Sequence, residues 1–383
     1  MRILHTSDWH LGRSFHRVGM LEHQAAFIDH LVDAVVSEGI DAVVVAGDVY
    51  DRALPSVDTV ALLDDALARL RAAGAQVLLT SGNHDSPARL GFASRVLEAG
   101  GVHLRTRVAD LARPVLIADD VGPVALYGLP YLEPAMTADA LDADRTHQGV
   151  LSAAMSRVRA DLATRPSATR SVVAAHAFVV GGQGSDSERD ISVGGVGAVP
   201  LAVFAGVDYV ALGHLHGRQQ LSPTARYSGS PLTYSFSEAG HAKGSWIVEL
   251  GPRGVTTVEP LPAPVPRPLA LLRGRIEDLL VDPALTHAEN AWCQVVLTDA
   301  VRPRAAMARL QARFPHTLSL AFEPEGAAVA PADYSTRVRG RTDLDVCCGF
   351  VEHVRGAGPD DDERAVLAAA LDRARELERG EAA

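Results

Sequence analysis

The sequence predicts an α/β protein built in layers, followed by a small α+β domain and two terminal helices. Across residues 1–250, short apolar segments alternate with amphipathic ones, the pattern of strands and their covering helices. A proline-rich passage at 260–268 then interrupts both periodicities. At 383 residues the chain is also longer than one typical domain of roughly 100 to 200 residues.

Apolar runs of strand length recur in the first part of the chain, and turn residues bound them. We expect strands at 2–7, 41–47, 75–81, 124–129, 171–177, 207–213, 225–229 and 245–250. Residues 28–35 and 60–70 instead repeat apolar side chains at helical spacing. These two helices should cover a sheet.

The proline-rich passage predicts a domain boundary. In this interpretation residues 1–258 form the first domain and residues 259–268 a stiff linker. Residues 269–325 combine three short strands with two helices, which predicts a small α+β domain. Residues 342–383 carry two helices, and the acids from Asp360 onward suit a helix N-terminus with a capping box. The apolar stripe of the last helix either packs on its own domain or is left for a partner.

Several classes of protein are excluded by composition. No apolar run approaches the roughly 20 residues that cross a bilayer, and the N-terminus lacks the zones of a secretory signal. The three cysteines, Cys293, Cys347 and Cys348, are odd in number and lack metal-finger spacing. We therefore expect a soluble cytoplasmic protein that does not associate with membranes.

The formal charge of −11 argues against a protein that holds nucleic acid by bulk electrostatics. It does not exclude local basic surfaces or bound cations. Arg13, Arg52 and Arg89 lie near strand ends and are candidates for contacting phosphates, with ordinary solvated arginines as the alternative.

Side chains that commonly bind metals follow five of the expected strands at their carboxyl ends. They occur in Asp8-Trp9-His10, Gly47-Asp48, Gly82-Asn83-His84-Asp85, His176 and His214-Leu215-His216. Each segment alone has a plainer explanation, such as turn chemistry or a core histidine. Together they predict one site, because the carboxyl ends of strands in layered α/β folds meet at one edge. If these segments are extended, Asp8 and His10 point the same way, as do His214 and His216.

The candidate metal ligands offer nitrogen and oxygen and no thiolate. They are Asp8, His10, Asp48, Asn83, His176, His214 and His216. Such a set suits manganese, iron or zinc better than calcium or copper(I). It is too large for one ion, whereas two ions roughly 3.5 to 4 Å apart, bridged by a carboxylate, would use every ligand and form the clamp of phosphate-ester hydrolysis.

Six motifs extend this pattern into a family resemblance. They are HTSDWHLG, GDVYD, SGNHDS, GGQGSDSERDISVGG, DYVALGHLH and YSGSPLTYSFSEAG. They resemble the calcineurin-like metallophosphoesterase superfamily and, within it, the SbcD nuclease family of bacterial SbcCD complexes. The resemblance is dense to about residue 250 and looser beyond. It implies a four-layer αββα metallophosphoesterase sandwich with a small α+β capping domain and C-terminal helices.

The same resemblance implies two Mn²⁺ ions and a role for each candidate. One ion would be held by Asp8, His10, Asp48 and His216. The other would be held by Asp48, Asn83, His176 and His214, so that Asp48 bridges. His84 would be the catalytic residue, which donates a proton to the leaving oxygen or stabilises the charged phosphorane. Asp51 or Asp85 would orient it, although turn chemistry suits Asp85 better.

For function, the resemblance implies a DNA double-strand exonuclease and single-strand endonuclease that processes ends and hairpins in repair and recombination. Its partners would be DNA and the SbcC ATPase, with two nuclease subunits paired in a heterotetramer. A free-standing phosphodiesterase and a catalytically inert scaffold are the alternatives. The resemblance assigns no role to the loop at 181–190. It also marks Gly217-Arg218 as a departure, since relatives often carry a proline there.

Overall fold

The computed structural model describes residues 1–188, 197–325 and 341–381, and the chain forms two compact units, Met1–Glu323 and Pro324–Ala383. Among the described residues, no helix combines the length and apolar character that crossing a membrane requires.

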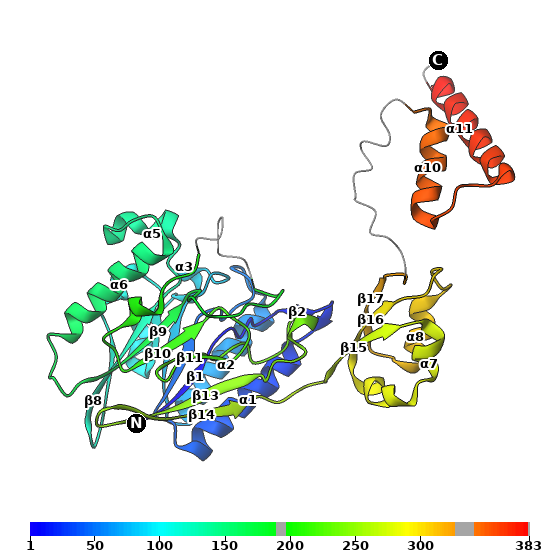
Figure 1. Ribbon diagram of the computed structural model, residues 1–383. Helices are drawn as coiled ribbons and strands as arrows, with labels where there is room; N and C mark the ends of the chain where they lie inside the picture. Colours follow the sequence, from blue (N-terminus) through cyan, green and yellow to red (C-terminus); the bar gives the residue numbers. More distant parts are fainter. Residues whose placement is uncertain (189–196, 326–340, 382–383) are drawn as a thin grey trace. The chain divides into compact units, whose positions relative to one another are not determined.

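Two six-stranded sheets form the centre of the first unit (Figure 1). In spatial order the first contains β14 (Gly254–Pro262), β13 (Gly244–Gly251), β1 (Arg2–Thr6), β4 (Ala42–Ala46), β5 (Gln76–Thr80) and β6 (Val102–Arg105). The second contains β11 (Gln219–Ser222), β12 (Ala225–Tyr227), β10 (Tyr209–Gly213), β9 (Arg170–His176), β8 (Gly122–Leu129) and β7 (Val115–Asp119). The central strands of both sheets are parallel, so their carboxyl ends lie at a common edge.

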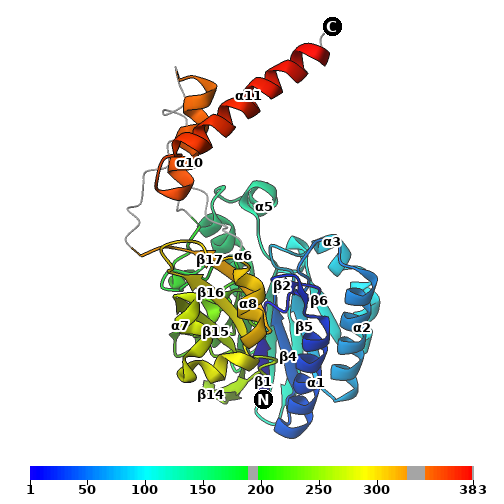
Figure 2. The ribbon, with the colours of Figure 1, turned by 90° about the vertical axis from the view of Figure 1, so that its right-hand side faces the viewer.

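Helices cover the outer face of each sheet. The first sheet packs against α1 (Leu21–Glu38) and α2 (Val57–Ala72), which Figure 2 shows beside β4 and β5. The second packs against α5 (Pro134–Leu141) and α6 (His147–Leu162). A third apolar cluster lies between the sheets. The layers are therefore α, β, β and α, and the predicted fold class is confirmed.

Strand β4 shows why the sequence folds this way. All five residues of Ala-Val-Val-Val-Ala are buried. Val43 and Val45 face the helices, whereas Val44 faces the second sheet. A parallel strand covered on both faces needs such a continuous apolar run. Helix α1 supplies one cover with Phe27, Leu31 and their neighbours.

Every strand expected in the first domain is present, and the structure adds several. These are the hairpin β2 (Ser14–Phe15) and β3 (Val18–Gly19), together with β6, β7, β11 and β14. Strand β14 runs to Pro262, so residues 259–262 of the expected linker are strand. Their prolines are tolerated because β14 lies at the edge of its sheet.

Short helices complete the first unit. They are α3 (Pro87–Leu90), α4 (Ser94–Leu97) and the 3-10 turns η1 (Glu98–Gly100), η2 (Val108–Asp110), η3 (Leu201–Phe204), η4 (Phe236–Glu238) and η5 (Pro283–Asn290).

A small α+β part follows within the same unit. Its parallel strands β15 (Leu269–Gly274), β16 (Trp292–Leu297) and β17 (Thr317–Phe322) share a core with α7 (Ile276–Val281) and α8 (Ala306–Arg313). Trp292 packs on Phe15 of the β2–β3 hairpin, with 5.3 Å between ring centroids. This aromatic contact joins the α+β part to the sandwich.

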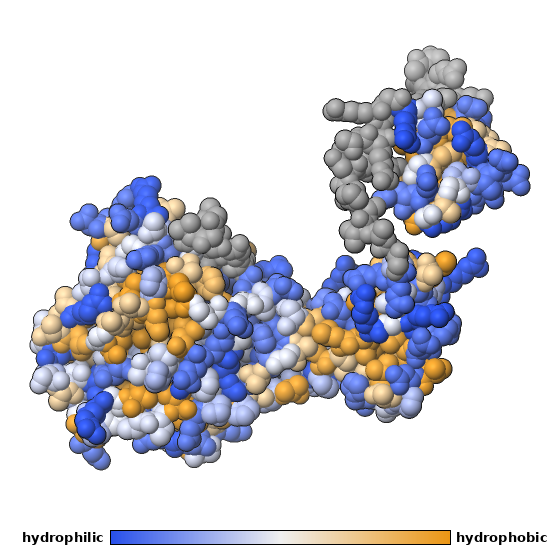
Figure 3. Space-filling view, in the orientation of Figure 1, coloured by the Kyte–Doolittle hydropathy of each residue, from blue (hydrophilic) through white to orange (hydrophobic). Residues whose placement is uncertain are grey.

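The second unit contains α10 (Asp343–Arg355) and α11 (Asp361–Glu381). The expected capping box is present, since the backbone N–H of Glu363 donates to Asp360 Oδ1 at 2.8 Å and that of Asp360 donates to Glu363 Oε2 at 2.9 Å. No residue of α10 is buried. Figure 3 shows apolar surface on these helices between hydrophilic residues.

Candidate metal centre

The loops after five parallel strands bring all the predicted ligands together. Asp8 and His10 follow β1, Asp48 follows β4, and Asn83 follows β5. From the second sheet, His176 ends β9, and His214 and His216 follow β10. Three overlapping groups have ligand atoms within 4.8 Å of one another: Asp8, His10 and His216; His10, Asp48 and His84; and Asp8, Asp48 and His176.

Asp48 lies at the centre of the cluster. Its Oδ2 is 3.6 Å from His10 Nε2 and 3.5 Å from His176 Nε2. Its Oδ1 accepts a hydrogen bond of 2.9 Å from the backbone N–H of His84. One carboxylate oxygen thus faces histidines from both sheets, an arrangement that would allow Asp48 to contact two ions.

The other candidates surround Asp48. His10 Nε2 lies 3.0 Å from His216 Nε2, and His176 Nε2 lies 2.8 Å from Asn83 Oδ1. The rings of His176 and His214 are 5.3 Å apart between centroids. Nitrogen and oxygen atoms with lone pairs therefore converge on the same space.

The backbone reaches this arrangement differently from the sequence-based expectation. Asp8, His10, Asp48 and His214 have φ angles of 52°, 45°, 48° and 107°. They are not extended, so the expected alternation along a strand is wrong. Left-handed backbone at a residue other than glycine costs of order 1 to 3 kcal/mol and is concentrated at functional sites. Hydrogen bonds of 3.0 Å from the N–H groups of Asp8 and His10 to the Gly47 and Asp48 carbonyls hold two of these turns.

Glycines precede three of the ligands because there is no room for a side chain. A Cβ at Gly82 would lie 2.4 Å from the backbone nitrogen of Asp48. A Cβ at Gly47 would lie 2.4 Å from His176 Nδ1, and one at Gly213 would overlap the carbonyl oxygen of Ala46. The loops from both sheets therefore pack in direct contact.

The charges of the cluster are balanced poorly by the protein itself. Asp8 and Asp48 are buried, and neither forms an ion pair with Lys or Arg among the described residues. Burial raises the pKa of Asp8 well above its usual range, and the charge of Asp48 adds to the rise. Burial likewise lowers the pKa of His10, with His216 and His84 adding to the effect.

Divalent cations would offset this imbalance. A buried ion without a partner costs several kcal/mol, whereas neutral imidazoles and carboxylates are good ligands for a metal. His10 Nδ1 lies 3.6 Å from Asp51 Oδ1, so it is His10 Nε2, 3.6 Å from Asp48 Oδ2, that faces the cluster. The donor set and its electrostatics fit divalent metal ions.

Hydrogen bonds on the far side of the rings fix which nitrogen faces the cluster. His176 Nδ1 is 3.0 Å from the carbonyl oxygen of Ala46, and His84 Nδ1 is 2.7 Å from that of Asp51. A carbonyl only accepts, so each Nδ1 carries the hydrogen. In His176 this leaves the Nε2 lone pair as a ligand, as in many metal sites.

His216 has a more elaborate support. Its Nδ1 lies 2.6 Å from Ser187 Oγ and 3.1 Å from Glu238 Oε1. Lys243 Nζ donates to Glu238 Oε2 at 2.6 Å and to the carbonyl oxygen of His216 at 2.9 Å. The charge of Glu238 is thereby paired inside the protein. Burial acts to raise its pKa, but hydrogen bonding from His216 and the charge of Lys243 hold it below its usual range.

The loop at 181–190 contributes to this support through its described residues. Besides Ser187, Glu188 accepts a hydrogen bond of 2.7 Å from the backbone N–H of His216. Residues 189 and 190 lie outside the described residues. Sequence reasoning assigned no role to Glu238, Lys243 or this loop. The available signal was polar residues within the motifs GGQGSDSERD and YSFSEAG.

Asp85 ties loops together. Its carboxylate accepts hydrogen bonds from the backbone N–H groups of Val49, Tyr50 and Gly82 at 3.1, 2.9 and 2.9 Å. Burial, followed by the charge of Asp48, raises the pKa of Asp85 to about 7. Asp51 is the acid nearer to His84, with 3.9 Å between Asp51 Oδ1 and His84 Nδ1.

Comparison with known proteins agrees with this chemistry. Residues 1–218 match the family model described as calcineurin-like phosphoesterase. Residues 265–355 match the SbcD_C model, described as the type 5 capsule protein repressor C-terminal domain.

Two solved structures match at low sequence identity. The crystal structure of TT1561 from Thermus thermophilus matches at 15% identity and a TM-score of 0.40, covering 68% of this chain and 98% of that one. A dimetal phosphatase from Danio rerio matches at 15% identity and a TM-score of 0.40, covering 69% and 99%.

These distant likenesses carry no information on the reaction, which rests on the family match. Because that family model spans more than half of the 383 residues, the chain belongs to the calcineurin-like phosphoesterases, metal-dependent phosphoester hydrolases, and its second match gives it the domain composition of the SbcD type.

Proposed function

We propose that the chain is a manganese-dependent DNA nuclease that works as the SbcD subunit of an ATP-dependent SbcCD complex. It acts as a double-strand exonuclease and single-strand endonuclease. The observation that carries the proposal is the convergence of Asp8, His10, Asp48, Asn83, His176, His214 and His216 on one buried site, with His84 beside Asp48. The SbcD_C match over residues 265–355 supports the SbcD assignment.

In this proposal two Mn²⁺ ions occupy the cluster and share Asp48. When bound, such ions lower the pKa of water and neutralise charge on a phosphate. The protein's own contribution is to hold neutral imidazoles and carboxylates in place before metal arrives. The hydrogen bonds from His176 to Ala46 and from His216 to Glu238 serve that purpose.

His84 is the proposed general acid. Its Nδ1–H is held by the Asp51 carbonyl, so its Nε2 is the atom that would carry the transferred proton. Its backbone N–H bonds to Asp48, which fixes the ring near the cluster without making it a ligand in this proposal. Proton transfer to a leaving sugar oxygen is worth about 10² to 10⁴ in rate.

The partners belong to the same proposal. The C-terminal helices within 342–383 would dock on the SbcC ATPase, and two nuclease subunits would pair in a cytoplasmic heterotetramer. The α+β domain at 269–325 would cap the site and contact DNA. A negative net charge is compatible with this role because the ions and the ATPase supply positive surface.

The direct test is hydrolysis of labelled duplex and circular single-stranded DNA by the full chain, alone and with an SbcC-type ATPase. We expect cleavage that requires Mn²⁺ and is lost in Asp48→Asn. Hydrolysis of bis(p-nitrophenyl) phosphate without any cleavage of DNA under either condition would overturn the nuclease assignment in favour of a small-ester phosphodiesterase.

A further inference from the structure

Two arginines share one tryptophan and lack any acidic partner among the described residues, and one of them, Arg218, lies two residues after the candidate ligand His216. The guanidinium carbons of Arg218 and Arg226 lie 5.0 and 4.7 Å from the centroid of the Trp246 ring. The ring is held in place because its Nε1–H donates to the carbonyl oxygen of Tyr227 at 2.9 Å. Three different segments, the loop before β11, strand β12 and strand β13, therefore build this cluster.

The positive charges of the cluster are not compensated. Neither arginine forms an ion pair within the described part of the chain. Arg226 is 8% exposed, and its guanidinium donates a hydrogen bond of 2.5 Å to a neutral group, Gln220 Oε1. Arg218 Nη1 and Arg226 Nε are buried without a hydrogen-bond partner among those residues. Buried guanidinium nitrogens that find no acceptor indicate a missing anion or water.

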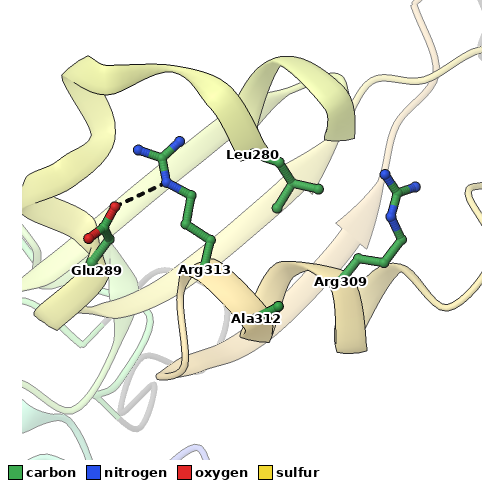
Figure 4. A pocket seen from close by; sticks show the side chains of 5 residues that line it. All are labelled: Leu280, Glu289, Arg309, Ala312 and Arg313. Carbon is green, nitrogen blue, oxygen red and sulfur yellow. Dashed lines mark hydrogen bonds and ion pairs between the residues drawn. The ribbon is translucent and has the colours of Figure 1, made fainter.

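Other arginines of the protein show the contrast. In the α+β part, a cavity of about 520 Å³ is lined by Leu280, Glu289, Arg309, Ala312 and Arg313 (Figure 4). There Arg313 pairs with Glu289 at 3.1 Å and Arg309 pairs with Glu277 at 2.7 Å. Those two arginines are paired with acidic residues of the protein. The cavity therefore needs no bound anion to balance their charge.

The position of the cluster relates it to the reaction. Arg218 follows His216 by two residues, so their Cα atoms are at most roughly 7 Å apart. Trp246 is paired in register with His5, close to the end of β1 that leads to Asp8. The part of the metal centre nearest to Arg218 along the chain is therefore the flank formed by His216. Because a polynucleotide carries further phosphates on either side of the one being cleaved, a phosphate is the anion that this flank would meet.

We propose that Arg218 and Arg226 form a subsite for a non-scissile phosphate of a polynucleotide substrate. The inference rests on the proposed nuclease function and goes further by naming residues that distinguish a strand from a small ester. Guanidinium groups bind phosphate oxygens through paired N–H donors, and stacking on Trp246 pre-orients them. The site takes a phosphodiester oxyanion, whose recognition is independent of the base.

The test uses Arg218→Gln in the full chain, with Arg218→Lys as the conservative variant. Arg69→Gln, on α2, is the matched control, because Arg69 pairs with Asp29 at 2.7 Å and lies outside the parts proposed to contact DNA. Arg218 is half-buried, so its replacement is better tolerated than that of Arg226, and thermal melting verifies the fold. Binding of a labelled single-stranded oligonucleotide is measured by fluorescence anisotropy in EDTA. We expect Arg218→Gln to weaken oligonucleotide binding about tenfold, with Arg218→Lys intermediate. The slope of log K against log salt concentration should fall in magnitude by about 1, as for the loss of one phosphate contact.

Kinetics separate this inference from the proposed function. With Mn²⁺, Arg218→Gln should raise KM for the oligonucleotide about tenfold and leave kcat/KM for bis(p-nitrophenyl) phosphate within about twofold. Equal oligonucleotide binding by Arg218→Gln and Arg69→Gln would overturn the subsite. Inorganic pyrophosphate that displaces the oligonucleotide at equal concentration would also overturn its assignment to a strand. A wild-type protein that cleaves the small ester but no DNA would instead contradict the nuclease function itself.

Discussion

The metal centre and the C-terminal helices differ in the interactions that stabilise them. The centre joins loops from five strands, buries its charges and places several ligands in left-handed backbone. The unit of α10 and α11 is built from neighbouring residues, with the capping box and the Arg355–Glu363 ion pair at 2.6 Å. Phe350, Val354 and Val366 are exposed. Preorganisation of the centre depends on long-range packing, whereas the helices depend on local interactions and expose apolar surface.

We expect the largest effect on the metal centre from His84→Gln, which tests the proposed general-acid role of His84. Loss of the proton donor should reduce kcat on DNA by about 10² to 10⁴. Metal binding should persist, because His84 is not proposed as a ligand. Steady-state kinetics and manganese titration by calorimetry measure both quantities. His30→Gln, on α1, serves as a control, and near-normal kcat in His84→Gln with metal bound would refute the acid role.

The packing between the loops is tested by Gly82→Ala. The added methyl group would overlap the Asp48 carboxylate, which must then move. Displacement of a catalytic group by about 1 Å costs roughly 10² in rate. We expect a loss of this size in kcat/KM together with weaker manganese binding. At Gly100 an added Cβ meets nothing within 4 Å, so Gly100→Ala should behave like the wild type. Equal activity of the two variants would show that Asp48 tolerates displacement.

The residues of the metal centre show which features could be predicted from the sequence and which could not. The convergence of the candidate ligands could be predicted because parallel strands in an α/β fold deliver their carboxyl ends to one edge. The left-handed φ angles of Asp8 and His214 could not, since they arise from contacts between loops distant in the chain. Edge strands such as β14 were also missed, because its prolines resemble a linker and only its partner β13 makes it a strand.

The support of His216 was hidden for a similar reason. Glu238 and Lys243 lie in the segment between β12 and β13, and nothing in their spacing indicates that they turn back toward β10. Only the fold places Glu238 Oε1 beside His216 Nδ1.

Glu238→Gln tests the support of His216 within the metal centre, and we expect a smaller effect than in the two variants above. Gln keeps the shape but removes the charge that orients His216 and pairs with Lys243. Replacing such a supporting carboxylate typically weakens metal binding by about 10- to 100-fold. Manganese titration should show weakening in this range, with Glu238→Asp closer to the wild type. The exposed Glu259→Gln is the control, and unchanged manganese affinity in Glu238→Gln would leave Glu238 with a purely structural role.

Deletion of residues 342–383 should have the smallest effect on chemistry. The helices belong to a separate compact unit, so hydrolysis of bis(p-nitrophenyl) phosphate should change by less than about twofold. Association with an SbcC-type ATPase should be lost in the same truncated chain, as measured by co-purification. Retained association would refute docking through these helices, and a large loss of small-ester hydrolysis would show that the two units are energetically coupled.

Anomalous scattering from manganese-soaked crystals tests the central claim most directly. The account predicts two peaks, both in bonding contact with Asp48, one also with His10 and His216 and the other with Asn83 and His176. A single peak at saturating manganese, or peaks away from Asp48, would contradict it.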